Sequence, residues 1–177
     1  VGVGVYYYDA LARTVEEEVF IQSNKSYEVL KAELGRLMYV NEQKQLYLML
    51  NHTLYKIDLT TFEESVLLKS DNANCYAVSE SGRYFAWINP EQLNSSEYIV
   101  LEDFKTGISY HVTSGHNTYL KPITFIGEDF VYGVAHKSSI TEDVFGELVF
   151  SMSSIEILRL STLMPNCLFK ASATSLV

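Results

Sequence analysis

The chain has 177 residues, of which 47% are apolar and 20% charged, and its formal net charge is −9. This composition is typical of a globular protein and excludes a disordered one. The acidic balance disfavours partners with dense negative charge, so we expect neither nucleic acid nor an anionic membrane surface as a partner.

No apolar run approaches the roughly 18 residues that a transmembrane helix needs, so we expect no transmembrane segment in this chain. The sequence also shows no signal peptide. Because Val1 is not an initiator methionine, we expect the chain to be a piece of a longer protein. The compartment stays unknown from these observations.

The first unit, residues 1–34, contains two apolar runs, 6–11 and 19–21, which predict two strands. A connector over 27–34 follows them. Its apolar residues have helical spacing, but an edge strand with a loop fits equally well. The sequence leaves both interpretations open, and the unit is truncated relative to those that follow.

The next two units each predict four short antiparallel strands joined by polar turns. The predicted strands cover 36–40, 46–50, 54–59 and 66–69 in the unit 35–70, and 75–79, 84–88, 98–103 and 108–113 in the unit 71–114. The last unit, 115–177, predicts strands at 122–126, 130–135, 144–150 and 155–160, and residues 166–171 could supply one more.

The units are variants of one repeat. In three of them an apolar strand runs into an aspartate, namely Asp9, Asp58 and Asp103, and a polar turn and a second apolar run follow. The aspartates lie about 45 to 50 residues apart, a period typical of propeller blades. We therefore expect an all-β fold, a single partial β-propeller domain of four-stranded antiparallel blades. Further blades or a second chain are needed to close the ring.

Two segments resemble a known family. Residues 79–87, Ser-Glu-Ser-Gly-Arg-Tyr-Phe-Ala-Trp, resemble the Ser-Pro-Asp-Gly-Lys-x-Leu-Ala-Trp/Phe sequence of TolB-type, WD-repeat-like β-propellers. Residues 103–107, Asp-Phe-Lys-Thr-Gly, resemble the Asp-x-x-Thr-Gly turn of the same family. The resemblance implies structural turn roles for Gly82 and Gly107, as for the three repeated aspartates. Lys44 stands where the second unit would have the glycine.

The sequence predicts no catalytic, cofactor-binding or metal-binding residue. It has no Gly-x-Ser-x-Gly elbow, no calcium loop and no phosphate-binding glycine loop. We interpret His111 and His116 as surface or hydrogen-bonded histidines rather than as metal ligands. Cys75 lies in an apolar strand and is expected to be a buried, inert thiol. A disulfide between Cys75 and Cys167 would require the two strands that carry these residues to lie side by side.

Function is expected on loops between the strands. The two longest polar loops cover 89–97 and 137–143, and they are the candidate interaction loops. Their candidate residues are Asn89, Glu91, Asn94, Glu97, Lys137, Glu142 and Asp143. Asn94 also begins a glycosylation sequence pattern, as do Asn24 and Asn51. Trp87 is expected to pack in the blade rather than to stack on a ligand.

The leading hypothesis is a non-catalytic binding module with a protein, peptide or glycan ligand, and the resemblance implies a bacterial cell-envelope protein. The alternative is an accessory propeller of a peptidase or glycosidase whose catalytic part lies outside this chain. A third possibility is an oligomer in which two chains complete one ring.

Overall fold

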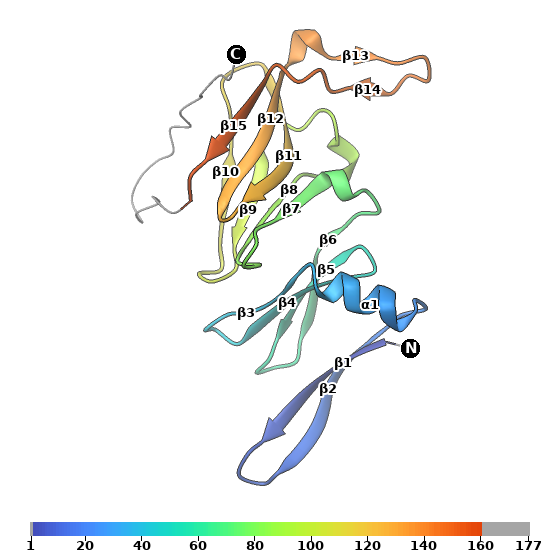
Figure 1. Ribbon diagram of the computed structural model, residues 1–177, viewed down its shortest axis with the longest axis vertical. Helices are drawn as coiled ribbons and strands as arrows, with labels where there is room; N and C mark the ends of the chain where they lie inside the picture. Colours follow the sequence, from blue (N-terminus) through green and yellow to red (C-terminus); the bar gives the residue numbers. More distant parts are fainter. Residues whose placement is uncertain (1, 161–177) are drawn as a thin grey trace. The chain divides into compact units, whose positions relative to one another are not determined.

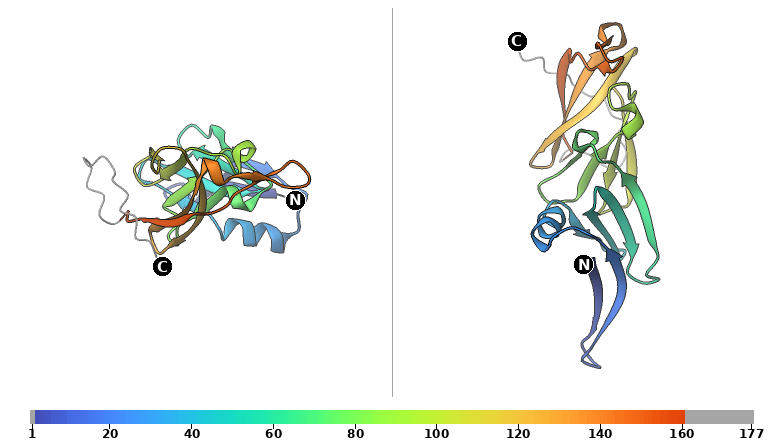
Figure 2. Two further views of the ribbon diagram at one scale, coloured as in Figure 1. Left: turned by 90° about the horizontal axis from the view of Figure 1, so that it is seen from above. Right: turned by 90° about the vertical axis from the view of Figure 1, so that its right-hand side faces the viewer.

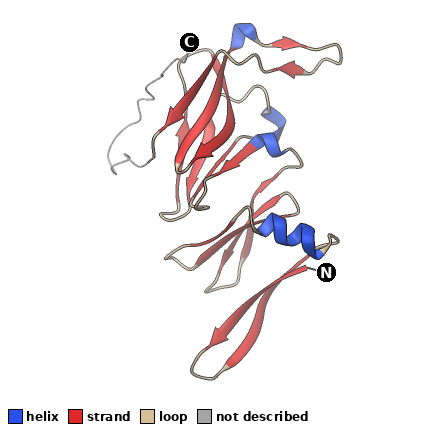
Figure 3. Cartoon of the chain, in the orientation of Figure 1, coloured by secondary structure: helices blue, strands red, loops and turns tan. Residues whose placement is uncertain are grey.

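The computed structural model describes residues 2–160, and short antiparallel strands dominate it (Figures 1 and 3). The chain divides into two compact units, Val1–Lys69 and Ser70–Val177. The predicted all-β fold of four-stranded antiparallel blades is confirmed, because each unit contains one complete antiparallel sheet of four strands in sequential order. The predicted last strand at 166–171 and Cys167 lie outside the described residues.

The first unit holds a two-stranded ribbon, one helix and a four-stranded sheet. The ribbon pairs β1 (Gly2–Asp9) with β2 (Thr14–Gln22). The sheet has the order β3-β4-β5-β6, with bounds Met38–Val40, Gln45–Leu50, Thr53–Asp58 and Glu64–Lys69. Strand β4 is apolar and buried after its first residue, Gln45, and is the most buried strand of this sheet, as expected for a strand with neighbours on both sides and both faces covered.

The connector that the sequence left ambiguous is a helix, α1 (Tyr27–Leu34). Its first turn closes with the Leu30 amide donating to the Ser26 carbonyl at 3.0 Å. Leu30 and Leu34, four residues apart, share one helix face. Both contact the apolar cluster of the unit, which includes Leu46 and Leu48 of β4. Tertiary burial of this two-leucine stripe therefore selects the helix over an edge strand.

Glu33 ties α1 to the sheet. Its Oε2 accepts the Asn51 amide at 2.9 Å, and its other oxygen forms an ion pair with Lys25. Burial alone would raise the pKa of Glu33, but the hydrogen bonds from Lys25 and Asn51 more than offset it and hold the pKa below its usual value. The buried carboxylate is therefore satisfied as an anion.

The described part of the second unit, residues 70–160, contains two larger sheets and a two-stranded hairpin. The first has the order β10-β9-β8-β7, with bounds Ile108–Val112, Ile99–Asp103, Tyr84–Trp87 and Tyr76–Val78. The 3-10 helix η1 (Ala73–Cys75) precedes β7, and η2 (Pro90–Gln92) lies between β8 and β9. The second sheet has the order β11-β12-β15, with bounds Thr118–Ile126, Asp129–His136 and Ser154–Leu158.

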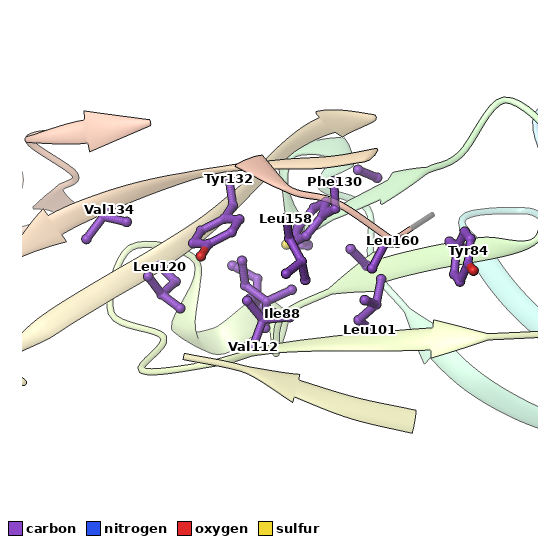
Figure 4. Close-up of a cluster of buried hydrophobic side chains, with 14 residues drawn as sticks. Tyr84, Ile88, Leu101, Val112, Leu120, Phe130, Tyr132, Val134, Leu158 and Leu160 are labelled. Carbon is purple, nitrogen blue, oxygen red and sulfur yellow. The ribbon is translucent and has the colours of Figure 1, made fainter. Parts of the chain in front are cut away.

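An apolar core joins the two sheets of the second unit. Figure 4 shows Leu101 and Ile88 from one sheet and Phe130, Tyr132 and Leu158 from the other, turned toward a shared interior. Phe130 and Tyr132 stack with their ring centroids 5.4 Å apart. Cys75 belongs to the same core, is fully buried and is not in a disulfide, which confirms its prediction as a buried thiol.

The predicted strand at 144–150 is only partly correct, because Leu148–Val149 alone form a strand and it pairs outside the main sheet. Residues 144–150 do not join the sheet; they lie in an insertion between β12 and β15 that contains η3 (Lys137–Ser139) and the hairpin β13 (Thr141–Glu142) and β14 (Leu148–Val149). Gly146, with φ of +81°, turns the chain back and divides the apolar run. The hairpin extends away from the sheet (Figures 1 and 2), and the third strand is β15 instead.

The repeated aspartates all begin the same turn. Asp9 Oδ1 accepts two backbone amides, Leu11 N at 2.8 Å and Ala12 N at 2.9 Å. Asp58 accepts the amides two and three positions on, and Asp103 accepts the amide two positions on. The residue four positions after each aspartate has positive φ, and these residues are Arg13, Phe62 and Gly107.

Candidate binding site

The two candidate interaction loops meet at one end of the second unit. The loop at 89–97 joins β8 to β9, and the insertion that begins at Lys137 joins β12 to β15. The Lys137 ammonium forms an ion pair with Glu97, and Asn94 Nδ2 donates to the Leu148 carbonyl at 2.7 Å. Contacts between residues 40 and 54 positions apart in sequence thus join the two segments into one continuous rim.

Lys137 is held on three sides at the base of the insertion. Its amide donates to the Asn117 carbonyl at 2.9 Å, and its ammonium lies 5.0 Å from the centroid of the Tyr119 ring. The hydrogen bond to Glu97 raises the pKa of Lys137, so the lysine stays charged. Glu97 is exposed and Lys137 is partly exposed, so solvent screens the attraction between them and the pair adds little to stability. Its role is to position the insertion.

Asn94 connects the rim to the strand beneath it. Its side-chain Oδ1 accepts a hydrogen bond from the Lys121 ammonium at 3.1 Å, while its Nδ2 donates to Leu148. One amide therefore links three segments: the β8–β9 loop, the hairpin and β11. The sequence pattern allows a glycan on Asn94. A glycan attached to Nδ2 would disturb the hydrogen bond to the Leu148 carbonyl and so weaken the link between the loop and the hairpin.

Beneath the rim lies a pocket of about 280 Å³. Tyr76 of β7, Lys121 of β11, and Phe150 and Met152 of the insertion contribute to its lining. The Lys121 ammonium lies 5.8 Å from the centroid of the Phe150 ring. The complete lining is Ala73, Asn74, Tyr76, Lys121, Pro122, Ile123, Phe150 and Met152.

The other candidate loop residues have mainly structural contacts. Asn89 Oδ1 accepts the Glu91 amide at 3.1 Å and so caps η2. Asp143 Oδ1 accepts the amides of Phe145 at 2.8 Å and Glu147 at 2.9 Å, which shapes the hairpin turn. Glu142 pairs with Leu148 across the hairpin and is exposed.

The pocket residues Tyr76, Lys121, Phe150 and Met152 were not among the sequence candidates. Each lies in or beside a predicted strand. In a strand, successive side chains point to opposite faces of the sheet, and this pattern does not show which strand ends come together in space. The apolar run ending at Phe150 was the available signal, but the only partly correct strand prediction there concealed the residue's position over Lys121.

The predicted turn residues are buried or tightly hydrogen-bonded. Asp103 is 4% exposed, and both its oxygens accept from the Arg83 guanidinium, at 2.8 Å and 2.7 Å. Burial would raise the pKa of Asp103, but the Arg83 hydrogen bonds and charge lower it below its usual value. Gly82 and Gly107 have φ of +74° and +71°, a conformation that glycine adopts at no steric cost.

The remaining polar candidates do not converge. His111 stacks on Tyr98 with ring centroids 4.6 Å apart. Across residues 2–160 there is no group of three or more His, Cys, Asp or Glu side chains that could hold a metal ion. Trp87 is half-buried, and within that same span its indole Nε1 is buried without a hydrogen-bond partner.

The first unit has its own, more apolar pocket of about 370 Å³ between the ribbon and the sheet. Val3 and Val5 of β1 face Leu46 and Leu48 of β4 across it, and Glu18 is its one acidic lining residue. Within residues 2–160, no helix is long and apolar enough to cross a membrane.

No protein-family model matches the chain, and no curated protein sequence matches it. Among solved structures, a crystal structure of the tricorn protease is similar over 95% of this chain, with 14% sequence identity and a TM-score of 0.40. The chain spans 17% of the length of that protease chain.

Proposed function

We propose that this chain is a non-catalytic binding module and that the rim formed by residues 89–97 and 137–152 is its binding surface. The supporting observation is that the two loops are joined by the Lys137–Glu97 ion pair and by the Asn94 bridge to Leu148. The insertion also contributes Phe150 and Met152 to a pocket. Loops held in place by a rigid sheet commonly carry binding residues.

The hairpin presents apolar side chains that the fold itself does not use. Val144 is 92% exposed and Phe145 is 86% exposed at its tip, and acidic residues flank them. Large exposed apolar side chains on an anchored hairpin favour contact with a protein or peptide. A cell-envelope location is part of this proposal and is supported by the sequence resemblance of residues 79–87 alone.

A selection experiment tests the binding surface. Peptides selected from a random displayed library on the 177-residue chain should protect amides of 89–97 and 137–152 from hydrogen exchange. A variant with Glu142–Leu148 replaced by Asn-Gly, a two-residue hairpin turn, should bind these peptides at least about tenfold more weakly.

The matched control is Glu128→Ala. Glu128 accepts from Ser81 at 3.0 Å in turns at the opposite strand ends of the same unit, so its loss should leave peptide affinity unchanged. Protection confined to other segments would contradict the proposal. Turnover of fluorogenic peptide or glycoside substrates by this chain would contradict the non-catalytic assignment.

A further inference from the structure

We propose that the pocket beneath the rim takes an acidic side chain of an extended peptide, with the peptide's neighbouring apolar side chain on Phe150 and Met152. This inference rests on the binding function proposed above and adds the chemical class of the ligand. The four features that carry it are the charge of Lys121, its neutral partner, the apolar lining and the size of the pocket.

Lys121 contributes a positive charge that the described residues do not neutralise. The ion pairs of residues 2–160 join Lys25 to Glu33, Arg83 to Asp103 and Lys137 to Glu97, and Lys121 is in none of them. The chain carries a net charge of −9. Although acidic residues outnumber basic ones, none of the described carboxylates forms an ion pair with this lysine at the pocket. Such a charge favours an anionic group from a ligand.

The neutral partner of Lys121 fixes its position without cancelling its charge. Asn94 Oδ1 accepts one of the three ammonium protons at 3.1 Å, and the Phe150 ring lies on another side at 5.8 Å. A lysine ammonium has three donors. At least one donor therefore remains for a ligand.

Several other residues of the lining are apolar. Phe150, Met152, Ile123 and Pro122 line the same pocket as Lys121, and Met152 is 45% exposed and Ile123 is 41% exposed. Exposed Met and Ile side chains next to the charge match an apolar residue beside the acidic one, and Met adapts to varied shapes.

The pocket lies at the lower end of the size range of small-molecule sites, which is compatible with a ligand that inserts one side chain. Its volume of about 280 Å³ lies just below the ~300–1,000 Å³ of small-molecule sites. A terminal carboxylate is usually held by converging backbone amides, whereas the charge here comes from a single ammonium. We therefore assign the pocket to a side-chain carboxylate of Asp or Glu within a peptide.

Short end-blocked peptides with a fluorescent label test this assignment on the whole chain. The first has Glu-Leu at the centre of a Gly/Ser sequence, and the second has Gln-Leu there. We expect the Glu-Leu peptide to bind about tenfold more tightly than the Gln-Leu peptide in fluorescence anisotropy. Raising the salt concentration should weaken only the Glu-Leu peptide.

Two variants with the same change of charge supply the control. Lys121→Gln should weaken the Glu-Leu peptide about tenfold and leave the Gln-Leu peptide unaffected. Lys105→Gln removes an exposed lysine on the β9–β10 turn, at the strand ends away from the pocket, and should change neither affinity. Thermal unfolding of both variants checks that each is folded.

Equal binding of the Glu-Leu and Gln-Leu peptides, or equal effects of the two lysine variants, would overturn the assignment. Equally tight binding by a Gln-Leu peptide that ends in a free carboxylate would also overturn it, in favour of a chain terminus. If library-selected peptides protect the rim but do not prefer acidic residues, the ligand class is wrong and the binding function stands. If they protect other segments, both proposals fail.

Discussion

Lys44 adopts a left-handed backbone conformation, with φ of +57°, in the turn between β3 and β4. Its amide donates to the Asn41 carbonyl at 3.1 Å, as the Gly82 amide donates to Ser79 at 2.9 Å in the corresponding turn. For a residue with a Cβ, this conformation costs about 1–2 kcal/mol of folding free energy. Glycine avoids this strain, but it also makes the unfolded chain more flexible, and that effect cancels part of the gain in stability.

Replacing Lys44 by Gly should therefore raise the free energy of unfolding of the first unit by about 0.5–1 kcal/mol. Lys44→Ala is the matched control, since it removes the long side chain but keeps the Cβ, and it should give no such gain. Urea denaturation followed by hydrogen exchange of the first unit measures both. A glycine variant no more stable than the alanine variant would show that the turn is unstrained.

The Arg83–Asp103 pair makes stability depend on pH. The pKa of Asp103 is lower in the folded chain than in the unfolded chain, so its contribution is fully present above the unfolded value near 3.9. The contribution is lost as the pH falls through the folded pKa. Asp103→Asn should cost about 1.5–3 kcal/mol at pH 7 and much less at pH 2.

Unfolding of wild type and Asp103→Asn at a series of pH values measures this difference. Glu63→Gln, which neutralises an exposed carboxylate, serves as the control and should track the wild type throughout. A difference between wild type and Asp103→Asn that stays constant from pH 7 to pH 2 would contradict the assignment of the ion pair.

For single residues, the sequence predicted the positions of turns better than the side-chain contacts that hold them. Gly82 and Gly107 were identified because glycine itself signals positive φ. Phe62 adopts the same conformation, with φ of +59°, but its identity gives no such signal. The contact between Arg83 and Asp103 depends on which strands pair and in what register, and spacing along the chain does not determine that.

At the scale of elements, a buried polar contact ties β15 to β12. The Tyr132 hydroxyl donates to Glu156 Oε2 at 2.7 Å, and Ser114 Oγ donates to Glu156 Oε1 at 2.9 Å. Tyr132 is fully buried and Glu156 is 8% exposed. Burial raises the pKa of Tyr132, and the hydrogen bond to Glu156 raises it further, so the hydroxyl remains a donor.

Tyr132→Phe should lower the free energy of unfolding of the second unit by about 1–3 kcal/mol, because it leaves a buried carboxylate oxygen without its donor. Ser114→Ala should cost less, since Ser114 is only half-buried and water can replace it. Thermal unfolding with hydrogen exchange over β15 measures both. A larger loss from Ser114→Ala than from Tyr132→Phe would contradict this order.

The elements differ in how far the sequence determined them. The four-stranded sheets followed from alternation and short polar turns, both local signals. The helix α1 could not be separated from an edge strand because two leucines suffice for either, and only burial of Leu30 decides. The hairpin of the insertion was missed because Val144 and Phe145 resemble strand residues, although both are exposed at a turn.

At the scale of the whole molecule, the two compact units should open independently. Leu48→Ala in the first unit and Phe130→Ala in the second each remove a fully packed side chain, which costs about 2–5 kcal/mol. Each substitution should speed hydrogen exchange within its own unit and leave the other unit's protected amides unchanged. Equal acceleration in both units by either variant would show a single cooperative structure.

The ribbon β1–β2 has a consequence for solubility. Across residues 2–160 its sheet contains only these two strands, and β1 is an uncharged, proline-free run up to Asp9, with Tyr6, Tyr7 and Tyr8 more than half exposed. Such a segment can template cross-β stacking of one chain on the next. The glutamates at 16–18 on the paired strand act as gatekeepers that make stacking repulsive. Replacing these glutamates by glutamine should yield thioflavin-positive fibrils under conditions where a solution of the natural chain stays clear. The charge of this ribbon therefore protects strand edges whose backbone hydrogen-bonding groups are not paired within its own two-stranded sheet.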